Sequence, residues 1–254
     1  MKKDYGRRTQ LRLVEKGIRA VASTYGKRSL VTSSSKAGGL LAVESQAERI
    51  FASMLSIDPT VRRFKPQPFV VDIVYRRILR TPEDVAEARA RHRFRTRDVF
   101  YTPDFEVHKV DGKLEVIEVK LESFEGDGYY RSKLAEVART LREYGYRFSQ
   151  VVLPGNRRHP IYMNAQLLRQ ASQRHGQRPS IELFDAIGPA HEAGAKTLRD
   201  FGVALGALAN QMPFLIVGGG LAADLIARPI DWSLPAWPAH GDLDHLRLIG
   251  GFER

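Results

Sequence analysis

The chain contains no cysteine, which excludes disulfide bonds, thiolate zinc sites and cysteine nucleophiles. It also lacks a long apolar run. No segment approaches the ~18 consecutive apolar residues of a membrane-spanning helix, and the first residues are basic instead of forming the apolar core of a signal peptide. These absences favour a cytoplasmic protein without a membrane partner. The 254 residues are enough for two domains.

The chain also has fewer acidic than basic residues. Lysine and arginine total 40 against 29 aspartate and glutamate residues, a net charge of +11. Residues 1–40 hold ten basic residues against Asp4 and Glu15, a net charge of +8. Lysine and arginine neutralise phosphates, so this balance favours nucleic acid as a partner, associated with the nucleoid. We expect residues 1–39 to form a basic N-terminal arm.

Hydrophobic periodicity predicts an α/β domain over residues 40–158 and a second, mainly helical domain over 159–254. Leu11, Val14, Ile18 and Val21 recur at helical spacing, which predicts a short amphipathic helix in the arm. The other predicted helices are 43–57, 83–90 after an N-cap at Thr81 and Pro82, 130–144, 161–175 and 190–208. The predicted strands are 67–75, two strands joined around Asp111 and Gly112, and 148–153.

Charged residues interrupt two short apolar segments, "YTPDF" at 101–105 and "LEVIEVK" at 114–120. Side chains alternate between faces along a strand, so Glu118 and Lys120 point to the same side. A cross-strand ion pair on a solvated face would explain that pair alone. Asp104 changes this interpretation if it faces the same two residues.

The turn between the two strands decides what Asp104 faces. A two-residue turn at Asp111 and Gly112 puts Asp104 opposite a residue whose side chain points to the other face. A three-residue loop that adds Val110, with glycine in the left-handed region, puts Asp104 directly opposite Glu118. We favour the second register because it also pairs apolar side chains with each other, although Asp-Gly by itself is the usual two-residue signal.

Two carboxylates at ~5 Å between Cβ atoms repel each other unless a cation lies between them. Mg²⁺ takes oxygen ligands and needs only one or two carboxylates beside an incoming phosphate. Lys120 on the same face would orient the attacking water or stabilise the transition state. Asp104, Glu118 and Lys120 therefore predict metal-dependent hydrolysis of a phosphodiester bond.

These motifs resemble the signature of the PD-(D/E)xK nuclease superfamily, in "TPDF", the fourteen residues from Asp104 to Glu118, and "EVK". In order, "VESQAERIFASMLSIDPTVRRFKPQPF", "YTPDFEV", "VIEVK" and "RSKLAEVARTLREYGYRFSQVVL" resemble the TnsA-type endonuclease subunit of heteromeric DNA transposases, over about residues 28–153. The resemblance implies a restriction-endonuclease-like mixed sheet flanked by helices. It also implies one or two Mg²⁺ ions, for which Mn²⁺ is expected to substitute, bound by Asp104, Glu118 and a helix glutamate that matches Glu48.

Three further residues have competing interpretations. Glu48 closes an S-x-x-E capping box that begins at Ser45, so it is either a helix cap or a metal ligand, and Glu44 one turn earlier is a competing candidate. Gln67 lies near the site by resemblance, or is a strand-entry residue between two prolines. Lys133 matches a family lysine, or is an exposed helical lysine.

An arginine-rich insertion is predicted at 76–99. The segment "RARHRFRTR" repeats arginine at every second position, which on a strand forms a ladder on one face suited to a phosphate backbone. A solvated arm is the alternative. The ladder consists of Arg89, Arg91, Arg93, Arg95 and Arg97.

The C-terminal segment carries weaker signals. "VGGGLAADL" lacks the spacing of a phosphate-binding loop and is interpreted as a turn. By resemblance, residues 159–254 form a winged-helix-like module that docks partners, with "LRDFGVALGAL", "GLAADLI" and "LRLIGG" supplying helices and a final strand. The implied function is cleavage of double-stranded DNA at transposon 5′ ends, with a DDE-type transposase subunit and an AAA+ ATPase regulator as partners. The alternatives are a stand-alone restriction or repair nuclease and a nuclease-like domain that binds DNA without cutting it.

Overall fold

The chain folds into two compact units of mixed α/β structure. The computed structural model describes residues 14–15, 18, 30–95, 99–124, 126–174 and 179–253. The first unit comprises the described residues up to Ala52, Thr60–Gly155 and Glu253, and the second comprises Ser53–Pro59 and Asn156–Phe252. The boundary expected at 158 and 159 lies close to this division, although one short segment before Thr60 belongs to the second unit.

The first unit is built on a mixed four-stranded sheet in the order β10-β9-β8-β4. Its strands are β4 (Val61–Pro66), β8 (Phe105–Lys109), β9 (Leu114–Leu121) and β10 (Tyr146–Leu153). β10 runs parallel to β9, and the other neighbouring pairs are antiparallel. The parallel pair is connected through helix α4 (Gly128–Glu143), as a parallel connection requires a crossover.

Helices cover both faces of this sheet. The apolar face of α4 packs on Val116 through Leu134, Val137 and Leu141, which recur at helical spacing. On the opposite face, Phe51 of α2 (Gln46–Ile57) contacts Phe105, with ring centroids 5.3 Å apart. β9 is therefore covered on both faces. A charged side chain in such a strand is unfavourable unless it is paired or hydrogen-bonded.

The β8–β9 hairpin adopts the three-residue loop. Phe105 pairs with Ile117, the Lys109 N–H donates to the Lys113 carbonyl at 2.9 Å, and Gly112 has a φ of 86°. That left-handed value is costly for a residue with a Cβ atom, which explains why glycine closes the loop in spite of the two-residue signal. The predicted register is confirmed.

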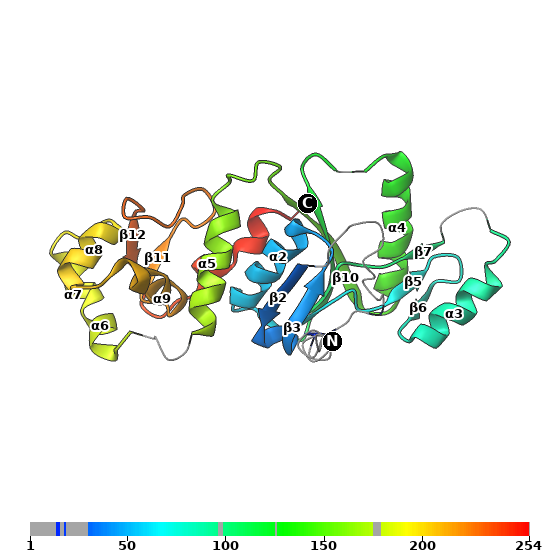
Figure 1. Cartoon of the computed structure of the whole chain (residues 1–254), viewed down its shortest axis with the longest axis horizontal. Coiled ribbons are helices and arrows are strands. Elements are labelled where there is room, and N and C mark those ends of the chain that lie inside the picture. The colour runs from blue at the N-terminus through cyan, green and yellow to red at the C-terminus, as the bar shows by residue number, and fades with distance from the viewer. Residues whose placement is uncertain are drawn as a thin grey trace, which may run out of the picture. The chain divides into compact units, whose positions relative to one another are not determined.

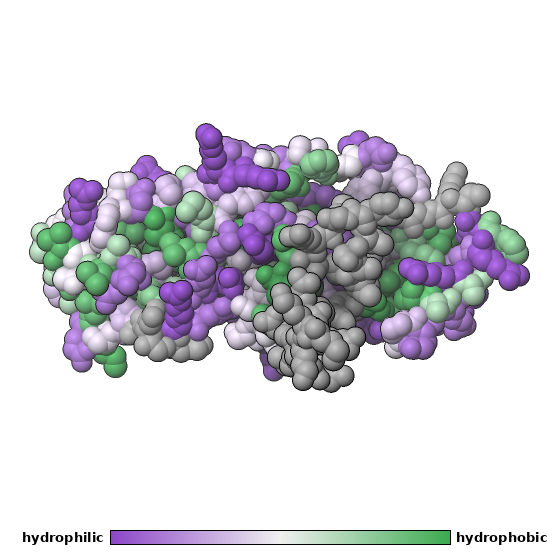
Figure 2. Space-filling model, viewed as in Figure 1, coloured by the Kyte–Doolittle hydropathy of each residue, from purple (hydrophilic) through white to green (hydrophobic). Residues whose placement is uncertain are grey.

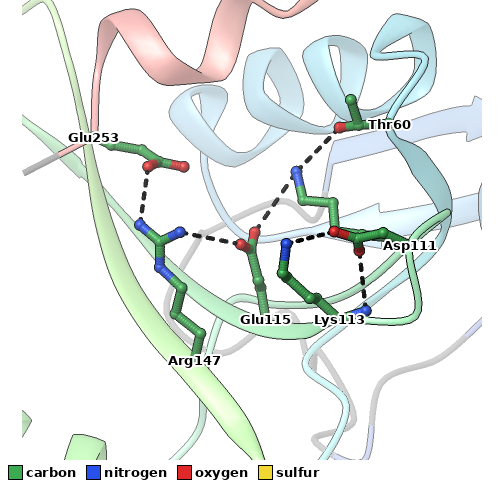
Figure 3. Close-up of polar contacts among 7 residues, drawn as sticks. Thr60, Asp111, Lys113, Glu115, Arg147 and Glu253 are labelled. Carbon is green, nitrogen blue, oxygen red and sulfur yellow. Dashed lines mark hydrogen bonds and ion pairs between the residues drawn. The ribbon is translucent and has the colours of Figure 1, made fainter.

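A network of charged side chains ties the end of this hairpin to β10 (Figure 3). The buried Glu115 carboxylate lies 3.6 Å from Lys109 Nζ and 3.6 Å from Arg147 Nη1. Arg147 Nη2 also lies 3.4 Å from Glu253 Oε2, and a β-bridge joins Glu253 to Val151 of β10. The chain terminus is thereby attached to the edge strand of the first unit.

The arginine-rich insertion forms a small lobe of its own. Strands β5 (Val70–Asp72), β6 (Arg77–Leu79) and β7 (Phe100–Tyr101) make a sheet in the order β6-β5-β7, beside helix α3 (Pro82–Arg91) (Figure 1). Figure 2 shows both hydrophilic and apolar side chains over α3. The strand predicted over 67–75 is shorter than expected, because the chain turns after Asp72, whose carboxylate accepts hydrogen bonds from the N–H groups of Val74 and Tyr75 at 3.1 Å.

The N-terminal segment differs from the expectation. Val14–Glu15 form strand β1, which runs parallel to β3 (Gly39–Val43), where a helix was predicted. Of the other residues in that predicted helix, the structure describes Ile18 alone. Leu30–Ser34 form β2, antiparallel to β3, and the 3-10 helix η1 (Ser35–Ala37) connects the two strands. Residues 30–39 of the expected basic arm therefore belong to this sheet and its connection.

The second unit is mainly helical. It contains α5 (Ile161–Gln173), α6 (Ile181–Asp185), α7 (Ile187–Glu192), α8 (Leu198–Leu205), η3 (Ala209–Gln211), α9 (Met212–Val217), β11 (Leu221–Ala223), β12 (Ala236–Pro238), η4 (Asp244–Leu246) and η5 (Leu248–Gly251). A capping box between Thr197 and Asp200 starts α8, and Gly206 ends it with a φ of 60°.

Two expectations for this unit are corrected. "GLAADLI" supplies strand β11 and no helix, because it pairs antiparallel with β12, and "LRLIGG" supplies the 3-10 helix η5 and no final strand. In the described part of the chain, no single helix is long and apolar enough to cross a membrane. One bent pair, 198–205 with 209–217, meets that test only when its helices are taken together.

Candidate active site

The hairpin register brings Asp104 and Glu118 face to face. Asp104 directly precedes Phe105, whose partner is Ile117, so continuing the pairing by one residue places Asp104 opposite Glu118. Lys120 lies two residues further along β9 on the same face, and its Nζ is 2.8 Å from Glu118 Oε1. The three residues singled out from the sequence are therefore neighbours on the side of the sheet that α4 covers.

Two tyrosines hold the buried carboxylate of Glu118. The hydroxyl of Tyr101, the last residue of β7, donates to Oε2, and the hydroxyl of Tyr130 in the first turn of α4 donates to Oε1. Lys120 Nζ also lies 4.8 Å from the centre of the Tyr130 ring. Burial lowers the pKa of Lys120, but the attraction of Glu118 and the hydrogen bonds that Lys120 donates to Glu118 and Tyr130 outweigh it, so the net shift is upward. Lys120 is thus a cation across the neutral range.

Asp104 is turned inward along the end of β9. Its Oδ2 accepts a hydrogen bond from the Val119 N–H at 2.8 Å. Burial raises the pKa of Asp104 well above its ordinary value, and the charges of Glu118 and Glu48 raise it further, against smaller opposing effects of the Val119 hydrogen bond and Lys120. The carboxylates of Asp104, Glu118 and Glu48 therefore repel one another in a poorly solvated site.

Glu48 closes the predicted capping box at the start of α2. Its Oε1 accepts from the Ser45 hydroxyl at 2.7 Å, its Oε2 accepts from the Glu44 N–H at 2.9 Å, and its own N–H donates to Ser45 Oγ at 3.1 Å, which is the capping box. Glu48 is also buried. Burial raises its pKa, the hydrogen bonds from Ser45 and Glu44 lower it, and the charges of Glu44 and Glu118 raise it, with a net upward shift. The cap holds Glu48 within electrostatic reach of the Asp104–Glu118 pair.

Gln67 lies next to Asp104 in the backbone. Its N–H donates to the Asp104 carbonyl at 2.9 Å, and its carbonyl accepts from the Ile18 N–H at 3.0 Å. It is buried with a φ of 42°, an unfavourable value for a residue with a Cβ atom. In the described part of the chain its buried Oε1 has no hydrogen-bond partner. A strained backbone and an unpaired polar atom beside Asp104 support the position of Gln67 near the site.

The carboxylates fit a hard divalent cation. Among the described residues, no three acidic or histidine side chains converge tightly enough to hold an ion as they stand. Asp104 and Glu118 form a facing pair, however, and one or two carboxylates are what Mg²⁺ takes from a protein beside a phosphate. The repulsion that raises the pKa of Asp104 is the repulsion that a bound cation would remove.

The prediction that the alternating arginines form a ladder on a strand is wrong. Thr81 and Asp84 form a capping box, Pro82 occupies the first turn, and the helix that they start continues through Arg91. On a helix, residues two apart point in different directions, so Arg89 and Arg91 do not share a face. Arg91 pairs with Glu87 at 2.8 Å, Arg93 and Arg95 follow the helix outside any strand, and Arg97 lies outside the described residues. The alternating sequence was compatible with a strand or a helix, and the capping box at its start favours the helix.

Tyr101 and Tyr130 were missed by the sequence interpretation. Tyr101 is part of "YTPDF", three residues before Asp104, and burial, together with Glu118 and Asp104, raises its pKa well above the ordinary value. Tyr130 lies three residues before Lys133, on the same side of α4. In the sequence, the helical spacing between Tyr130 and Lys133 was the only signal for Tyr130. That spacing does not reveal that Tyr130 contacts Glu118 of β9.

No protein-family model matches the chain, and no curated protein matches it significantly. The fold and the site therefore define a class by geometry alone: a mixed α/β protein in which two facing carboxylates, a third nearby carboxylate and a half-buried lysine gather beside one sheet.

Proposed function

We propose that this chain is a metal-dependent DNA endonuclease with a restriction-endonuclease-like core. The observation that carries the proposal is the hairpin register, which when continued by one residue sets Asp104 opposite Glu118, with Lys120 on the same face. Two facing carboxylates in a buried setting cost stability, and a structural role would be met by apolar residues. The net charge of +11 supports a nucleic-acid substrate.

The chain's own residues have distinct tasks in this proposal. Asp104 and Glu118 supply oxygen ligands, and Glu48 adds negative charge to the same place. Lys120, kept protonated by Glu118, orients the attacking water and stabilises the negative charge that develops on the phosphate. A bound Mg²⁺ or Mn²⁺ ion supplies a more acidic water and neutralises phosphate charge.

A lysine substitution tests this assignment. Lys120→Ala should abolish cleavage of plasmid DNA in Mg²⁺ and leave DNA affinity within about twofold, because one ammonium is a small part of the phosphate attraction. Lys113→Ala is the matched control, since Lys113 is exposed in the hairpin loop and pairs only with Asp111 among the described residues. Cleavage by Lys120→Ala at the wild-type rate would refute the site.

The transposase-subunit form of the proposal rests on the sequence resemblance. It makes this chain the TnsA-type subunit that hydrolyses DNA at transposon 5′ ends together with a DDE-type transposase, under an AAA+ ATPase regulator that joins through the second unit. The test is incubation of the chain with Mg²⁺ and a plasmid carrying transposon ends, with and without the cognate transposase. Cleavage only in the complex supports this form.

The rival functions predict other results of the same assay. Efficient, sequence-specific double-strand cleavage by the isolated chain would favour a stand-alone restriction or repair nuclease. DNA binding without cleavage under every condition would favour a nuclease-like binding module. The repulsion among Glu48, Asp104 and Glu118 argues against the latter, because a module that only binds DNA gains nothing from buried like charges.

A further inference from the structure

A cavity of about 700 Å³ opens between α3 and α4, within the first unit. Its apolar lining includes Val70, Val85 and Phe100, and its polar groups include Arg89 of α3, Lys133 of α4 and the Thr102 hydroxyl. No acidic side chain is among the described residues that line it. An apolar floor with two cations at the walls suits a ligand that carries both an aromatic ring and a phosphate.

The chain connects this cavity to the candidate active site in two ways. At the end of β7, Tyr101 and the following Thr102 line the cavity, Tyr101 also donates to Glu118, and Asp104 follows two residues after Thr102. Along α4, Tyr130 contacts Glu118, and one turn later Lys133 reaches the cavity. A strand bound at Glu118 and Lys120 therefore has the cavity immediately beside it.

The α3 wall is arranged to present a cation. Pro82, Val85, Ala86 and Arg89 lie on one face of the helix at helical spacing, and all four line the cavity. The acidic neighbour Glu87 pairs with Arg91 instead, so Arg89 has no ion-pair partner among the described residues. The capping box at Thr81 fixes where α3 begins and hence which residues face inward.

We propose that this cavity holds one or two unpaired nucleotides of the DNA strand next to the cleaved phosphate, with phosphates at Arg89 and Lys133 and a base against Phe100. The volume is that of a pocket for a small ligand and does not admit a duplex. Base stacking on an aromatic ring combined with backbone cations is the usual way in which proteins hold single strands. This inference rests on the proposed nuclease function, and it assigns the insertion a role in recognising DNA structure.

Binding measured without cleavage tests the proposal. In Ca²⁺ or EDTA, the full chain should bind a duplex with a short single-stranded tail about tenfold more tightly than a blunt duplex, the effect of roughly one stacked base. Arg89→Ala combined with Lys133→Ala should remove this preference and leave blunt-duplex affinity within about twofold. Arg139→Ala, an exposed arginine on α4 that pairs with Glu136, is the matched control and should keep the preference.

A second measurement places the tail directly. A photocrosslinking residue in place of Ala86, which is exposed at the cavity wall, should crosslink to the tail and not to the paired region. No tail preference in the wild type, an intact preference in the double variant, or crosslinks confined to the duplex would each overturn the proposal. A free deoxynucleoside monophosphate that displaces the tail at equal concentration would also overturn it, in favour of an effector site.

The two proposals fail separately. A tail preference that depends on Arg89 and Lys133, in a chain that never cuts DNA, would keep the cavity assignment and reject the nuclease. Cleavage that depends on Lys120, in a chain that binds blunt and tailed duplexes equally, would keep the nuclease and reject the cavity assignment.

Discussion

At the scale of single residues, the carboxylate of Glu118 is surrounded by three donors. Tyr101, Tyr130 and Lys120 all contact its two oxygens, so a cation must compete with them for the carboxylate. Tyr130→Phe removes one donor and should tighten Mg²⁺ or Mn²⁺ binding by about threefold to tenfold, the effect of one charge-assisted hydrogen bond. Isothermal titration calorimetry measures this directly.

Tyr129→Phe is the control for Tyr130→Phe, because the neighbouring Tyr129 is 55% exposed. Unchanged metal affinity is expected for this control. Weaker metal binding by Tyr130→Phe would show that the hydroxyl orients Glu118 for the ion and does not compete with it.

Asp104 gives a prediction about stability. Its raised pKa means that the folded state favours the neutral carboxyl. The contribution of the neutral Asp104 to the free energy of unfolding is therefore lost as the pH rises from the ordinary pKa of 3.8 through the raised pKa of the folded state. Asp104→Asn keeps an acceptor for the Val119 N–H and removes the charge. In EDTA at neutral pH it should raise the free energy of unfolding by about 1 kcal/mol, measured with urea.

The Asp104→Asn variant should also respond differently to metal. The wild type should gain stability when Mg²⁺ is added, because the ion binds the folded state, and the variant should not. Asp111→Asn is the control: Asp111 is exposed, and its hydrogen bonds with Lys113 lower its pKa, so removing that charge should not stabilise the protein. Equal urea midpoints for Asp104→Asn and wild type in EDTA would contradict the electrostatic picture.

At the scale of elements, a buried contact holds the end of helix α3. His92 Nε2 lies 2.9 Å from Asp72 Oδ2, and both side chains are almost fully buried. His92→Ala leaves a buried carboxylate without this partner and should lower the free energy of unfolding by about 3 kcal/mol. Hydrogen exchange should show the main loss of protection over Pro82–Arg91.

Arg93→Ala is the control for His92→Ala, because Arg93 is exposed in the turn after α3 and stacks only on Phe94 among the described residues. It should change stability by less than about 0.5 kcal/mol. Faster exchange spread evenly over the whole first unit would mean that the Asp72–His92 contact supports the sheet more than α3.

At the scale of the whole molecule, the two units should respond to pH through different groups. In the second unit, burial lowers the pKa of His245 below its ordinary value of 6.5, against smaller effects of its hydrogen bond to the Ile216 carbonyl and of nearby aspartates. A lowered histidine pKa means that the unfolded state binds the proton better, so stability falls as pH drops below about 6.5. His245→Gln keeps an N–H donor and cannot be protonated in this range.

Thermal unfolding at pH 7.5 and 5.5 measures the effect of His245→Gln. The wild type should lose stability between these values by up to about 1 kcal/mol more than the variant, since His245 is only partly buried. The same loss in both proteins would assign the pH dependence to other groups.

The sequence by itself determined the local features. Residue alternation put Glu118 and Lys120 on one face of β9, Gly112 made the three-residue loop possible, and the apolar pairing beside it set the register that brings Asp104 opposite Glu118. These features depend on residues close together in the chain, so local rules were sufficient.

Only the tertiary structure decided which distant groups meet. The alternating arginines suited a strand equally well, and the capping box at Thr81 together with the contact of His92 with Asp72 made that segment a helix. Tyr130 reaches Glu118 because α4 packs on β9, and the cavity exists because α3 and α4 stand on either side of Phe100. Such contacts join segments far apart in the sequence, where no spacing rule applies, because packing of the whole unit sets which side chains can touch.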